Sequence, residues 1–152
     1  MIRALLLFVL LLIGISAWDH FEFDITVFCN LPDRENYKML IEWYEADFFA
    51  GEEQLTQPMI LNPRIGKFSF SMNGAMDGDE VFSSGYSPRA YIIHDCTSDR
   101  KEVKLRLTIT TLCEIGTTCH YRIIRDLTND WGIYEAEANA LKHEMTPFPD
   151  FP

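Results

Sequence analysis

The chain has 152 residues, with 23 acidic and 13 basic side chains that give a formal net charge of −10. So acidic a chain repels phosphate backbones, which excludes nucleic acid as an expected partner. The same charge argues against simple electrostatic attraction to anionic lipid. The length fits one domain that can bury its own core.

The first 17 residues have the pattern of a secretory signal peptide. Arg3 supplies an early positive charge, an uninterrupted apolar run follows over 4–13, and Ser16-Ala17 ends the segment with small residues. The apolar run is shorter than the roughly 20 residues that a membrane span needs. We expect cleavage after Ala17, secretion to the extracellular space, and no membrane span in the mature protein. The alternative is an uncleaved N-terminal anchor.

Alternating apolar residues predict a half-buried strand over 21–30. Cys29 lies on the apolar side of this alternation and is expected to point inward. A second strand is predicted over 37–45 and a third over 66–72, again from a period of two. Between them, 47–63 is predicted as a long polar loop that contains a short apolar run between two prolines.

The second half of the chain continues this pattern. A loop rich in Gly, Asp and Ser is predicted over 73–88, and strands are predicted over 89–96 and 103–111. A further strand over 120–127 is expected to return beside the one before it as a hairpin partner. Residues 131–139 fit either a last strand or a short helix, because their Glu and Ala residues favour helix locally.

Together these elements predict one all-β domain over 18–140. Six or seven short strands separated by turn signals are typical of an antiparallel sandwich. The remaining residues, 141–152, contain three prolines and are expected to form a flexible tail.

One motif, His94-Asp95-Cys96, places a thiol close to an imidazole, as in enzymes with a cysteine nucleophile. Neighbouring strand residues point to opposite faces, however, so the Asp95 side chain would point away from those of His94 and Cys96. A cysteine in a secreted chain also favours a disulfide. We therefore expect His94 to be a partly buried, hydrogen-bonding residue.

Two further motifs suggest metals only weakly. Cys113 and Cys119-His120 could form half a zinc site, but five intervening residues exceed the usual two to four, and a second ligand pair is missing. The stretch 77–80 is acidic but lacks the spaced carboxylates of a calcium loop. We expect no metal, no cofactor and no catalytic residue.

The chain contains four cysteines, Cys29, Cys96, Cys113 and Cys119. Four cysteines allow three pairings, and spacing alone does not choose between them. The short separation of Cys113 and Cys119 around a Gly-containing turn favours a disulfide across a hairpin there.

Five stretches carry a family resemblance when they are taken in order. They are a strand that ends in Cys, a second strand before an acidic loop, a Gly-x-Phe strand, a His-Asp-Cys strand end and an alternating strand, at 26–30, 39–47, 66–70, 91–96 and 100–105. In this order, after a signal peptide, they resemble the nematode transthyretin-like family of secreted proteins.

The resemblance implies an immunoglobulin-like, prealbumin-type antiparallel β-sandwich of seven or eight strands. It also places Cys96 beside Cys29 and so implies that these two pair. The implied role is a binding module for a lipid, a small apolar ligand or a cell-surface protein. A related branch hydrolyses 5-hydroxyisourate and ends in Tyr-Arg-Gly-Ser, whereas this chain ends in Asp150-Phe151-Pro152. A secreted hydrolase is therefore the alternative, and we expect the protein not to be an enzyme.

Overall fold

The computed structural model of the chain describes residues 18–46, 51–77, 85–136 and 139–140. Every regular element in these ranges is a β-strand, which confirms the expected all-β class. The expected signal peptide (1–17), the tail (141–152) and most of the acidic stretch 77–80 lie outside the described residues. Within the described part, no helix has the length and hydrophobicity to cross a membrane.

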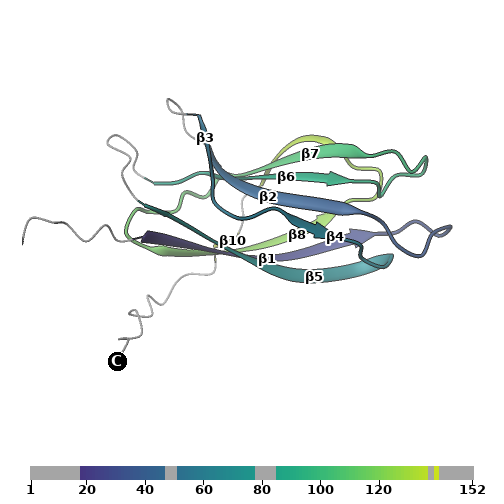
Figure 1. Cartoon of the computed structure of the whole chain (residues 1–152), viewed down its shortest axis with the longest axis horizontal. Helices are drawn as coiled ribbons and strands as arrows, with labels where there is room; N and C mark the ends of the chain where they lie inside the picture. The colour runs from purple at the N-terminus through teal and green to yellow at the C-terminus, as the bar shows by residue number, and fades with distance from the viewer. Residues whose placement is uncertain (1–17, 47–50, 78–84, 137–138, 141–152) are drawn as a thin grey trace, which may run out of the picture.

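The strands form two sheets that lie one above the other (Figure 1). The first sheet has the order β10-β8-β1-β5 and consists of β1 (Trp18–Cys29), β5 (Gly66–Asp77), β8 (Thr118–Asp126) and β10 (Asn139–Ala140). The second has the order β3-β2-β6-β7-β9, and β4 also pairs with β2. Its strands are β2 (Met39–Ala46), β3 (Glu52–Gln54), β4 (Met59–Leu61), β6 (Pro88–His94), β7 (Val103–Ile109) and β9 (Gly132–Ala136).

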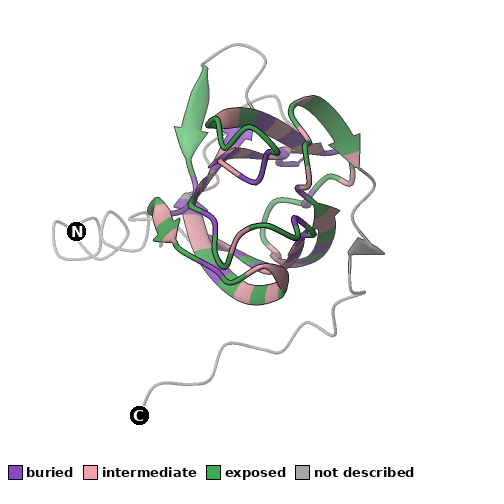
Figure 2. Cartoon of the chain, turned by 90° about the vertical axis from the view of Figure 1, so that its right-hand side faces the viewer, coloured by how far each residue is buried: buried purple, intermediate pink, exposed green. Residues whose placement is uncertain are grey.

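The core lies between the two sheets. Seen along the strands, exposed and less exposed residues alternate as bands on the ribbons (Figure 2). Phe23 of β1 stacks on Trp43 of β2 with ring centroids 4.0 Å apart and planes 8° from parallel. Both side chains are fully buried. Their contact joins the sheets face to face, as in a β-sandwich.

Strand pairing differs from the expected antiparallel sandwich at two places. β1 is antiparallel to β5 but parallel to β8, and β7 is antiparallel to β6 but parallel to β9. The prediction that residues 120–127 return beside 103–111 is wrong, because β8 lies in the other sheet. The chain crosses between sheets after β7 and again after β8. After the second crossing, β9 lies beside β7 and runs in the same direction, so these two strands are parallel.

Three segments form strands where the pattern did not place them. β3 and β4 lie inside the predicted loop 47–63, and β5 extends to Asp77, into the predicted loop 73–88. Of the ambiguous segment 131–139, residues 132–136 form strand β9 and not a helix. Pairing with β7 provides these residues with backbone partners, which outweighs their local helix preference.

Both expected disulfides are present. Cys29 ends β1 in the first sheet and bonds to Cys96, which follows β6 in the second sheet, with Cα atoms 6.0 Å apart. This bond ties the two sheets together. Cys113 and Cys119, with Cα atoms 5.8 Å apart, close the short crossover between β7 and β8.

Candidate functional site

The His94-Asp95-Cys96 motif is part of the scaffold. His94 is 1% exposed, and its Nδ1 accepts a hydrogen bond from the Cys96 backbone N–H at 3.2 Å. Burial lowers the pKa of His94, and nearby Asp130 offsets part of this effect. Asp95 pairs with Arg34 at 2.9 Å. Because the Cys96 sulfur is in a disulfide and the imidazole is buried, these residues cannot supply a nucleophile and its base.

His120 belongs to a polar cluster on the outer face of the first sheet. Its Nε2 lies 2.7 Å from Asp24 Oδ2, and its Nδ1 lies 3.7 Å from Glu22 Oε2. Ser71 Oγ donates to Asp24 Oδ1 at 2.7 Å. The pKa of Asp24 is lowered, first by the Ser71 hydrogen bond and then by the one from His120.

The order of groups in this cluster does not suit a serine hydrolase. In such enzymes the histidine accepts the serine proton, and a carboxylate orients the histidine from the other side. Here Asp24 lies between Ser71 and His120. A carboxylate with a lowered pKa is a weak base for the serine hydroxyl. The cluster therefore ties three strands together and lacks a nucleophile–base pair.

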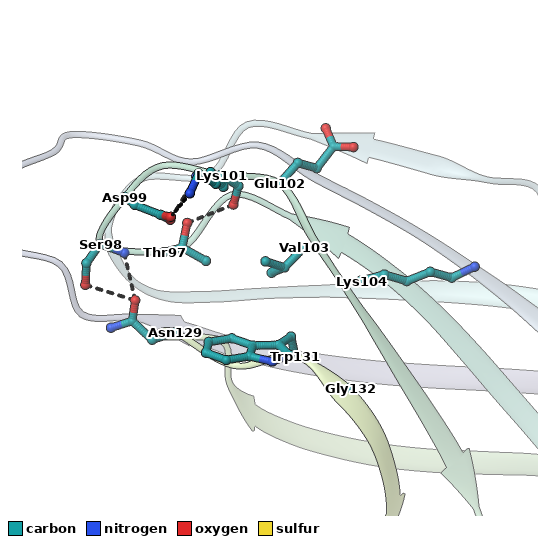
Figure 3. A pocket seen from close by; sticks show the side chains of 10 residues that line it. All are labelled: Thr97, Ser98, Asp99, Lys101, Glu102, Val103, Lys104, Asn129, Trp131 and Gly132. Atoms are coloured by element: carbon teal, nitrogen blue, oxygen red, sulfur yellow. Dashed lines mark hydrogen bonds and ion pairs between the residues drawn. The ribbon is translucent and has the colours of Figure 1, made fainter.

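An open groove of about 610 Å³ lies where the connection between β6 and β7 meets the connection between β8 and β9 (Figure 3). Its lining includes Thr97, Ser98, Val103, Asn129 and Trp131. We call this site the Trp131 groove. Neither histidine discussed above contributes to its lining.

The turn before β9 positions Trp131. Asn129 has a positive φ of 52°, a conformation that Asn tolerates better than most residues. Its backbone N–H donates to the Cys96 carbonyl at 2.9 Å, so the turn is bound to the disulfide. Asp130 pairs with Arg125 at 2.6 Å. The two residues directly before Trp131 are thereby held in place.

The interior of the groove is apolar. The Trp131 indole forms one wall, and the side chains of Val103 and Thr97 lie across the open space from it (Figure 3). Trp131 is 64% exposed. A large aromatic surface left open beside a hollow is a common feature of ligand-binding sites.

The polar groups of the groove bond mainly to one another. Ser98 donates from its backbone N–H and its hydroxyl to Asn129 Oδ1, at 2.7 and 2.9 Å. Thr97 Oγ1 donates to the Lys101 carbonyl at 2.8 Å. The Lys101 ammonium pairs with Asp99 at 2.9 Å. These bonds shape the rim and leave the apolar surface as the main feature open to a ligand.

A second, smaller cleft of about 80 Å³ has residues of β7, β8 and β9 in its lining. Arg125 and Tyr134 are among its lining residues, and the guanidinium lies 3.6 Å from the centre of the Tyr134 ring. The cleft is well below the 300–1,000 Å³ usual for small-molecule sites. The Trp131 groove is therefore the stronger candidate.

The chain matches no protein-family model and no curated protein. The candidate site therefore rests on geometry and chemistry alone. The motifs examined in the sequence did not include Trp131. The sequence feature that could have indicated the groove is a tryptophan directly after Asn129-Asp130, a dipeptide that favours turns.

Proposed function

We propose that this protein is a secreted extracellular binding module and that the Trp131 groove holds a small apolar or lipid-like ligand. The exposed indole beside an apolar hollow of about 610 Å³ carries this proposal. That volume falls within the usual range for small-molecule sites.

Three features support an extracellular role. Two disulfides are compatible with an oxidising compartment. Residues 1–17 have the pattern of a cleaved signal peptide. The two-sheet sandwich is also compatible with the transthyretin-like architecture that the resemblance implies.

The alternative is a secreted hydrolase related to 5-hydroxyisourate hydrolase. It would need a polar pocket on which histidines converge. His94 is buried, His120 pairs with Asp24, and neither lines the Trp131 groove. His143 lies outside the described residues. The positions of His94 and His120 therefore favour binding over hydrolysis.

The test compares the small molecules that copurify with the secreted protein and with two variants. Trp131→Ala removes the aromatic wall of the groove. Ile60→Ala removes a 79% exposed apolar side chain on β4, across the sheet from β9, and serves as the control. Organic extraction followed by mass spectrometry should recover a compound from the wild type and from the control, and at least tenfold less from Trp131→Ala.

Equal recovery from all three proteins would remove the groove from the proposal. Turnover of 5-hydroxyisourate that is lost in His120→Gln would overturn the binding role and favour the hydrolase.

A further inference from the structure

The hydrogen-bond acceptors of the Trp131 groove are largely engaged within the protein. Asn129 Oδ1 takes both Ser98 donors, and the Lys101 carbonyl takes the Thr97 hydroxyl. The Glu102 carboxylate points away from the indole (Figure 3). A sugar needs acceptors for its many hydroxyls, so the groove is poorly suited to carbohydrate despite its tryptophan.

The charges at the rim cancel. Asp99 and Lys101 form an ion pair, and Glu102 and Lys104 contribute one charge of each sign. The Lys104 ammonium lies 4.3 Å from the centre of the Tyr91 ring and so is drawn away from the groove. Lys101 and Lys104, the basic residues among those that line the groove, are both engaged elsewhere, so the charges favour a neutral ligand over one with an anionic head group.

Two side-chain donors beside the groove have no partner among the described residues, but neither points into it (Figure 3). Asn129 Nδ2 and Trp131 Nε1 donate no hydrogen bond to any residue in the described part of the chain. The orientation of the Asn129 amide follows from the network, since its Oδ1 must face the Ser98 N–H, which can only donate. The Asn129 amide nitrogen points away from the indole, and Trp131 Nε1 lies at the edge of the ring away from Val103, so the space between Trp131 and Val103 is apolar (Figure 3).

From these three observations we infer that the Trp131 groove takes a small, neutral, mainly apolar molecule that stacks on the indole. This inference rests on the proposed binding function and narrows its ligand class. It separates neutral apolar ligands from charged amphiphiles and from carbohydrates, which an exposed tryptophan alone would not do.

The experiment titrates the purified secreted protein with three probes. Prodan is a neutral naphthalene ketone, anilinonaphthalene sulfonate is an anion of similar size, and chitotetraose is tested by its ability to displace prodan. Prodan emission should rise to saturation on binding. The sulfonate should bind at least tenfold more weakly, and chitotetraose should not displace prodan.

Two variants connect the result to the groove. Trp131→Ala should weaken prodan binding roughly tenfold, equivalent to about 1.4 kcal/mol. Ile60→Ala should bind prodan as the wild type does.

Tighter binding of the sulfonate than of prodan, or displacement of prodan by chitotetraose, would overturn the ligand class and leave the proposed binding function standing. Prodan binding that is unchanged in Trp131→Ala would overturn the assignment of the groove. The proposed function itself fails if, in addition, no copurifying compound depends on Trp131, or if His120-dependent turnover of 5-hydroxyisourate is found.

Discussion

The two disulfides should contribute unequally to stability, and the structure allows the difference to be worked out. Cys29 and Cys96 are 67 positions apart, whereas Cys113 and Cys119 are 6 apart. In the chain-entropy model, the long closed loop stabilises the fold by about 4.4 kcal/mol and the short one by about 2.2 kcal/mol. Replacing both cysteines of a pair by Ala should therefore cost about 2 kcal/mol more for the first pair than for the second.

Thermal unfolding of the two double variants measures this difference. For a chain of this size, about 2 kcal/mol corresponds to roughly 8 °C in Tm. The positions of the two disulfides should also make the loss of Cys29–Cys96 the more destabilising change. Cys29–Cys96 joins the two sheets, whereas Cys113–Cys119 closes a local crossover. Equal losses in Tm, or a larger loss for the Cys113 and Cys119 variant, would refute the argument from loop length.

Three further predictions concern a buried histidine, a buried carboxylate and a close approach between two backbone segments. The lowered pKa of His94 keeps the ring neutral in the folded protein at pH values where the unfolded chain takes up a proton. The free energy of unfolding should therefore be constant above the ordinary pKa of 6.5 and fall by up to about 1.4 kcal/mol per pH unit below it. Urea denaturation across this pH range should show this slope in the wild type and not in His94→Asn. Asp19 is buried and accepts hydrogen bonds from the Tyr86 hydroxyl at 2.6 Å and from a backbone N–H at 2.8 Å. Asp19→Asn should therefore cost about 1–3 kcal/mol in chemical denaturation and Tyr86→Phe less, and an unchanged denaturation midpoint for Asp19→Asn would contradict this. A Cβ on Gly74 would lie 2.5 Å from the Leu55 carbonyl oxygen, so Gly74→Ala should destabilise the protein by about 1–3 kcal/mol, whereas a neutral result would mean that the two segments separate freely.

Most of the candidate site could not be predicted from the sequence. Pattern reasoning correctly assigned His94 and Cys96 to the scaffold, because alternation on a strand indicates which side chains point inward. It did not find the Trp131 groove, because Thr97 and Trp131 come from separate connections that meet only in the folded chain. The local sequence does not show whether a tryptophan after a turn is buried or open, because that depends on the segments that pack around it.

The sequence by itself determined the positions of the six longest strands, β1, β2, β5, β6, β7 and β8, and which of their faces are buried. The alternation from Phe21 to Cys29 appears in the structure as alternating burial along β1. This works because a period of two reports how each side chain stands relative to the sheet plane, which is a local property.

Only the tertiary structure decided which strands are neighbours. The parallel pairs of β1 with β8 and of β7 with β9, and the crossover that places β8 in the first sheet, join segments far apart in the chain. Residues 132–136 form a strand because β7 offers hydrogen-bond partners, although their local preference allowed a helix. Periodicity shows that a face is covered but not what covers it, since that depends on the packing of the whole chain.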